Sequence, residues 1–179
     1  MDSTKTFIKV YDISPELSED FEFYFDTDGV EEGRSDILTE LVPNLDHWGD
    51  VGWMEIEEYE YNPHRHNMHF VLDTKWAPPT RWLQQASQDT VYFENKLITM
   101  TTIQKDETLV TGVAIMDGEI LQNKPIFNME PEEVQKYYDE ESGYELDELD
   151  IQIWDSIGKF LNVCEEFYLE GGHSNDNDN

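Results

Sequence analysis

Apolar and polar residues alternate along much of the first two thirds of the chain, as they do in half-buried β-strands. These stretches are rich in β-branched and aromatic residues, and turn-forming residues separate them. The pattern predicts strands over residues 6–11, 54–61, 67–76, 91–103, 109–116 and 119–122, and a break near Asn95 is an alternative for the fourth. The turn sequences 62–66 and Asp117-Gly118 predict hairpins between the strands that flank them.

Two helices are predicted between these strands. Ser14 followed by Pro15 is typical of a helix start, and this helix is expected to run to about residue 25. Pro79-Thr80 precedes a second predicted helix over residues 81–87. The order of elements predicts an α+β fold, a ferredoxin-like sandwich with an antiparallel sheet and two helices on one face.

The last fifty residues have a different character. Pro131 opens a short predicted helix, and residues 147–167 predict a longer amphipathic one. Its apolar residues recur at helical spacing: Leu149, Ile153, Ile157, Phe160, Leu161 and Cys164. The helix is expected to dock on the rest of the protein through the first five of them. The predicted organisation is a ferredoxin-like domain over residues 1–125, an acidic helical extension packed on it over 126–170, and a disordered tail over 171–179.

Charge is distributed unevenly. The 179 residues carry 41 acidic and 11 basic side chains, for a formal net charge of −30. Residues 1–62 hold 18 of the acids and residues 129–179 hold 16, whereas residues 63–128 hold seven acids and six bases. Self-repulsion of this size opposes compaction, so two acidic flanks indicate a role for the charge, such as a basic partner.

Composition excludes several classes. The single cysteine, Cys164, allows no disulfide within the chain, and no apolar run approaches the about 20 residues that span a bilayer. The first residues lack the apolar core of a signal peptide. We therefore expect a cytoplasmic protein that avoids membranes, because anionic lipid surfaces would repel it.

The carboxylates themselves are the candidate partner-binding residues. Side chains at i, i+3 and i+4 on a helix lie about 5–6 Å apart, which is comparable to successive phosphates on one DNA strand. The candidate acidic surface comprises Glu16, Glu19, Asp20, Glu55, Glu57, Glu58, Glu60, Glu132, Glu133, Asp139, Glu140, Glu141, Asp147, Glu148 and Asp155. Such a surface imitates nucleic-acid charge and would repel nucleic acid itself.

The histidines, one acidic stretch and the tryptophans favour structural roles over metal or nucleic-acid binding. His64, His66 and His69 have the spacing of a loose zinc cluster, but strand alternation would separate His69, and Arg65 intervenes. Asp26 and Asp28 begin an acidic stretch that lacks the glycine at position 6 and the glutamate at position 12 of a calcium loop. The tryptophans Trp48, Trp53, Trp76 and Trp82 lack the basic groove of a base-stacking platform. We expect no catalytic residue, no cofactor and no metal.

Two tryptophan motifs carry a family resemblance. Trp48-Gly49-x-x-Gly52-Trp53 and Thr74-Lys75-Trp76-Ala77-Pro78-Pro79 resemble motifs of uncharacterised phage- and plasmid-encoded proteins with a ferredoxin-like domain, W-G-x-x-W and T-x-W-x-P-P. Residues 5–122 are covered. The first motif here has one extra residue and lacks the lysine before its second tryptophan, and the acidic C-terminal region lies outside the pattern. The resemblance implies the fold and a mobile-element origin.

Three functions are compatible with these observations. The first is a non-enzymatic phage-type protein that inhibits a basic nucleic-acid-binding host protein of defence, restriction or transcription by mimicking nucleic-acid charge. The second is a structural or regulatory interaction module whose acidity serves solubility. The third is a metal-dependent enzyme that uses His64, His66 and His69. Salt dependence of partner binding separates the first two, and metal content separates the third.

Overall fold

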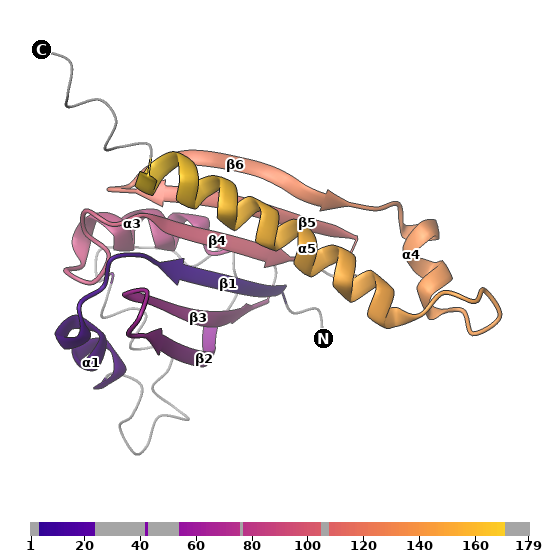
Figure 1. The fold of residues 1–179 in the computed structure, drawn as a ribbon, viewed down its shortest axis with the longest axis horizontal. Coiled ribbons are helices and arrows are strands. Elements are labelled where there is room, and N and C mark those ends of the chain that lie inside the picture. The colour runs from indigo at the N-terminus through magenta and orange to yellow at the C-terminus, as the bar shows by residue number, and fades with distance from the viewer. Residues whose placement is uncertain (1–3, 24–41, 43–53, 76, 105–107, 171–179) are drawn as a thin grey trace, which may run out of the picture.

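The computed structural model describes residues 4–23, 42, 54–75, 77–104 and 108–170. Six strands form one antiparallel sheet in the order β2-β3-β1-β4-β5-β6, shown in Figure 1. The predicted α+β class with an antiparallel sheet is therefore confirmed, and the sheet has six strands rather than four. The tryptophan motif at 48–53, the acidic stretch at 26–32 and the tail at 171–179 lie outside the described residues.

The strands are joined largely where turn chemistry predicts. The elements, in order, are β1 Thr4–Val10, α1 Pro15–Phe23, β2 Met54–Asn62, β3 Asn67–Thr74, α3 Thr80–Asp89, β4 Ile98–Ile103, β5 Leu109–Met116, β6 Glu119–Asn128, α4 Pro131–Tyr138, α5 Leu146–Cys164 and the π-helical turn η2 Glu165–Glu170. The β5–β6 hairpin turns at Asp117 and Gly118, both with positive φ, as a type I′ turn requires. The β2–β3 hairpin turns through residues 63–66.

Helices α1 and α3 pack on the same face of the sheet. Phe21 from α1 and Trp82 from α3 meet Phe70 of β3 in one apolar cluster, and each is at most 2% exposed. Phe93 joins them from the turn after α3, with its ring centroid 5.8 Å from that of Phe21. This aromatic layer forms the larger core, to which both helices contribute.

Helix α5 lies on the opposite face. Its stripe of Leu149, Ile153, Ile157 and Phe160 is buried against the strands, and Leu161 is half-buried beside them, so the predicted docking stripe is confirmed. Gly112 of β5 makes this possible, because a Cβ atom there would lie 2.8 Å from the Phe160 ring. Figure 1 shows α5 running across the strands toward β6.

Two sequence predictions about the strands are wrong. Strict alternation along residues 54–61 predicts Tyr59 and Tyr61 on the face opposite Ile56, but a β-bulge between Ile56 and Glu58 shifts the phase. All three residues therefore pack against the α1 side, where the Tyr61 hydroxyl donates to the carbonyl of Ile13 at 3.0 Å. Residues 91–95 form a turn instead of the start of a strand.

The C-terminal boundary of the sheet also differs. Strand β6 runs to Asn128, six residues beyond its predicted end and past the domain boundary proposed at 125. Pro125 lies within it, which is compatible with an edge strand because one side of the ladder has no partner. Within the described residues, no helix is both long and apolar enough to cross a bilayer.

Candidate interaction surface

Among the described residues, the largest concentration of negative charge lies on α4, the loop after it and the first half of α5. We call residues 130–155 the acidic arm. Its only basic residue is Lys136. Its eleven carboxylate side chains are all exposed: Glu130, Glu132, Glu133, Asp139, Glu140, Glu141, Glu145, Asp147, Glu148, Asp150 and Asp155. Figure 1 shows α4 and the following loop beyond the end of the sheet, so the arm is a projecting surface.

An apolar seam holds the acidic arm in place. Val134 of α4 is buried in a cluster with Leu149 and Ile153 of α5, and this cluster continues to Val110 of β5. Aromatic side chains brace the loop, with the rings of Tyr137 and Tyr144 5.3 Å apart. The Tyr137 hydroxyl accepts from the Gln152 amide at 2.9 Å. The helices that carry the carboxylates are therefore held in place by packing.

Local helix chemistry explains why the arm accommodates so many acids. Glu132 and Glu133 occupy the first turn of α4, and Asp147 and Glu148 occupy the first turn of α5. Negative side chains at a helix N-terminus are stabilised by the helix dipole, by about 0.3–1 kcal/mol each. Four of the eleven carboxylates therefore stabilise the helices that carry them, although the carboxylates repel one another.

The arm carries eight of the fifteen predicted acids, and the other seven lie on α1 and β2. The predicted residues on the arm are Glu132, Glu133, Asp139, Glu140, Glu141, Asp147, Glu148 and Asp155. Those on α1 are Glu16, Glu19 and Asp20, all exposed, and Figure 1 places α1 and α4 at opposite ends of the long axis. The predicted acids therefore do not form one continuous row.

The strand-borne acids are partly neutralised. Glu57 lies 3.1 Å from Lys5, and Glu60 lies 2.9 Å from the imidazole of His69. Glu58 is exposed beside them, and Glu55 belongs to β2 opposite Asp73 in the register. The Lys5–Glu57 ion pair makes β2 a weaker anionic surface than the arm. On the arm itself, Asp155 pairs with Lys159 at 2.7 Å, an exposed i,i+4 contact.

Exposed apolar side chains accompany the carboxylates of the arm. Tyr144, Leu146, Ile151 and Trp154 are between 46% and 67% exposed. The amphipathic pattern of α5 identified only the buried stripe and missed these residues. Ile151 and Trp154 lie outside the stripe at i, i+3 spacing, and that spacing is the sequence signal that identifies them as a second apolar patch.

The histidines do not converge. His64 and His66 lie in the exposed β2–β3 turn, where His66 adopts a positive φ of 51°. His69 lies in β3 and contacts Glu60. Within the described part of the chain, no three His, Cys, Asp or Glu side chains form a group that could hold a metal. The enzyme hypothesis that depends on this cluster receives no geometric support from these residues.

Two partly buried hydrogen bonds connect the C-terminal end of α5 to the sheet side of the protein. The Glu165 carboxylate accepts from the Lys9 amine at 3.1 Å and from the Tyr11 hydroxyl at 2.9 Å. Burial, with the Glu165 carboxylate beside it, holds the pKa of the Tyr11 phenol far above its usual value. Burial likewise raises the pKa of the Cys164 thiol to about 11, so this thiol is protonated at neutral pH.

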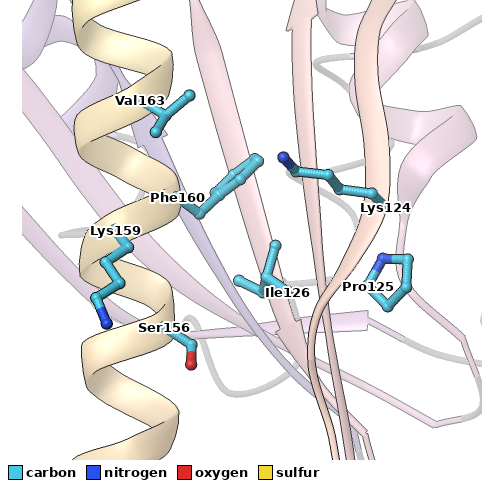
Figure 2. A pocket seen from close by; sticks show the side chains of 7 residues that line it. All are labelled: Lys124, Pro125, Ile126, Ser156, Lys159, Phe160 and Val163. Carbon is cyan, nitrogen blue, oxygen red and sulfur yellow. The ribbon is translucent and has the colours of Figure 1, made fainter.

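A shallow hollow separates α5 from the edge strand β6, as Figure 2 shows. Its volume is about 300 Å³, and Ile126 and Phe160 form its apolar lining. Lys124 extends from β6 toward the Phe160 ring, and Ser156 and Lys159 border the hollow on α5. Lys159 is already paired with Asp155, so the hollow contains no cluster of groups suited to acid–base chemistry.

Comparison with known proteins identifies no relative. No family model matches the chain, and neither the curated proteins nor the solved structures contain a significant match. The resemblance of the tryptophan motifs to phage- and plasmid-encoded proteins therefore stays a prediction. The acidic arm is the feature of the described structure on which a functional proposal can rest.

Proposed function

We propose that the protein binds a basic, nucleic-acid-binding protein through the acidic arm and thereby excludes nucleic acid from it. It acts by occupying a groove and not by catalysis. The observation that carries this proposal is the arm itself, with eleven exposed carboxylates and one lysine within residues 130–155. Charge of this density steers a basic groove toward the arm and accelerates association.

Three properties of the arm support binding to a protein. The carboxylates of neighbouring helical turns lie at a spacing comparable to that of phosphates along one strand. The buried seam around Val134 and Leu149 holds them in place, which lowers the entropic cost of association. The exposed Ile151 and Trp154 lie among them, and aromatic and apolar anchors within a charged rim are typical of protein interfaces.

The apolar anchors distinguish this proposal from acidity that serves solubility alone. A solubilising surface gains nothing from exposed Leu146, Ile151 and Trp154, which favour association. If the resemblance to phage- and plasmid-encoded proteins holds, the partner is a defence, restriction or transcription protein of the host cell. That cell's cytoplasm is then the compartment in which the protein acts.

We further propose that β1 to β4 with α1 and α3 form a ferredoxin-like unit to which β5, β6 and the arm were added. The order β2-β3-β1-β4 and the placement of α1 and α3 on one face support this assignment. The unit presents its β4 edge to β5, so the added hairpin extends the sheet and the arm continues from it. An experimental structure with another strand order would reject this assignment.

A pair of charge variants tests the site. The arm variant replaces Glu132, Glu133, Glu140 and Glu141 with Gln, and the matched control replaces Glu16, Glu19, Asp20 and Glu22 of α1 with Gln or Asn. All eight residues are exposed, and both variants remove four negative charges. A basic protein retained from a bacterial lysate is purified, and its dissociation constant for each variant is measured between 50 and 300 mM salt.

The proposal predicts that the arm variant binds at least about tenfold more weakly and with a shallower salt dependence, because fewer ion contacts form at the interface. The α1 variant is expected to retain most of the affinity, since α1 lies at the other end of the molecule. Equal losses in both variants would mean that net charge alone drives binding. Binding that is independent of salt would reject mimicry.

A further inference from the structure

A groove lies beside α5 on the half of its sheet face that the helix leaves uncovered. Its volume is about 300 Å³. Phe7 and Lys9 of β1 with His69 and Val71 of β3 form its floor, and Trp154 belongs to its α5 wall. This volume lies at the small end of the range for ligand sites. The groove is separate from the acidic carboxylates of the arm.

The strand register makes the groove polar at one end and apolar at the other. Phe7 pairs with Val71, two residues further along the strands Lys9 pairs with His69, and beyond them Asn67 pairs with Asn62. Successive pairs on one face are about 6.6 Å apart, because a strand rises about 3.3 Å per residue. At the apolar end, the ring of Trp154 lies edge-on to that of Phe7, with centroids 5.0 Å apart.

The side chains that line the groove are basic or uncharged, in contrast to the acidic chain as a whole. Acids outnumber bases by 41 to 11 in the chain, yet the described residues that line the groove include Lys9, Arg65 and His69 and no Asp or Glu. Glu165 pairs with Lys9, and Glu60 contacts the imidazole of His69; neither carboxylate belongs to the lining. Arg65 has no such ion pair within the described residues, so it is the group that would meet an anion.

Arg65 is also held at the groove by its backbone. The Asn62 side-chain oxygen accepts from the backbone N–H groups of His64 at 3.0 Å and Arg65 at 3.1 Å, which fixes the turn. Arg65 is exposed and lines the polar end of the groove together with Asn62 and Asn67. A planar guanidinium binds a carboxylate through two parallel hydrogen bonds.

We propose that this groove binds a small amphipathic organic anion, a carboxylate with an aliphatic or aromatic body. The carboxylate lies against Arg65 at the polar end. The apolar body lies over Phe7 and Val71 beside Trp154. This site shares Trp154 with the acidic arm but none of the arm's carboxylates, and it gives the protein a ligand that its overall charge would otherwise repel.

Three probes with the same apolar chain and different head groups test the proposal: octanoate, 1-octanol and octylammonium. Each is titrated calorimetrically into the full chain at 150 mM salt. The groove predicts saturable binding with one site and the order octanoate, then octanol, then octylammonium. A charge of −30 acting alone predicts the reverse order, with octylammonium bound most tightly.

Two matched variants locate the site. Arg65→Gln is expected to weaken octanoate binding by roughly tenfold or more, the size expected for a lost charge-assisted hydrogen bond, and to leave octanol unchanged. Arg81→Gln removes an exposed base from α3 and should change neither. The proposal is overturned if octanoate shows no saturable binding, if octylammonium binds best, or if the two variants have equal effects.

Discussion

Helices α1 and α3 enclose one face of the sheet in an aromatic layer, whereas α5 packs mainly over β4, β5 and β6 on the other face. On the first face Phe21, Phe70 and Phe93 are at most 1% exposed. On the second, α5 leaves the β1–β3 half open as a groove and continues toward the acidic arm. The comparison shows that the first face provides stability and the second provides candidate binding surfaces.

The largest effect is expected from a cavity in the closed face. Phe93→Ala removes a fully buried ring that contacts those of Phe21, Phe70 and Trp82. We expect the free energy of unfolding to fall by about 3–5 kcal/mol. Val91→Ala in the same turn, where the side chain is 59% exposed, should change it by less than about 0.5 kcal/mol. Equal urea midpoints for the two variants would contradict the packing described.

A smaller effect is expected where α5 meets β5. Gly112→Ala places a Cβ atom 2.8 Å from the Phe160 ring, so the ring or α5 must shift, at a cost of about 1–3 kcal/mol in unfolding free energy. Gly158→Ala on α5 meets nothing within 4 Å and should stabilise the helix by about 0.5–1 kcal/mol. Urea unfolding measures both. Changes of the same sign would show that α5 is not packed on Gly112.

The buried thiol of Cys164, at the end of α5, makes the free energy of unfolding depend on pH in the alkaline range. Its pKa is raised to about 11 from 9, so the folded state holds a proton that the unfolded state has released between these values. The free energy of unfolding therefore falls as pH rises through this window, and Tyr11 contributes with the same sign. Urea midpoints of the wild type and Cys164→Ala should converge between pH 9 and 11. A constant difference would contradict burial of the thiol.

Local patterns predicted several elements because those patterns have local physical causes. The Asp117-Gly118 hairpin follows from two residues that tolerate positive φ, and α5 follows from an apolar stripe. The stripe showed that α5 buries one side and carried no information about which face of the sheet it covers. The predicted acidic residues on the arm were recognisable as charges, but their separation from those on α1 depends on tertiary structure.

Other elements were mispredicted for equally specific reasons. The bulge after Ile56 leaves no mark in a run of alternating acids and tyrosines, so the faces of Tyr59 and Tyr61 were exchanged. Tyr92 and Phe93 favoured a strand by composition, but such residues also fill buried turns, and Asn95 supplies the positive φ that this turn uses. The groove was not predictable, because Phe7, Arg65 and Trp154 come from three distant segments.

The smallest effect on stability is expected from the arm. Replacing Glu132, Glu133, Glu140 and Glu141 with Gln removes mutual repulsion but also two favourable helix N-terminal charges. The free energy of unfolding should change by less than about 1 kcal/mol, and added salt should raise the melting temperature of the wild type by screening repulsion. A larger loss would mean that the charges support the fold and do not only lie on its surface.

Displacement of nucleic acid from the captured partner tests the central claim most directly. The purified partner is bound to a fluorescein-labelled duplex, and anisotropy is followed as the acidic protein is added at several salt concentrations. The proposal predicts that the anisotropy falls to that of free DNA, that displacement weakens steeply as salt rises, and that the arm variant displaces poorly. Anisotropy that rises instead, as a complex of all three forms, would contradict mimicry and leave a plain interaction module.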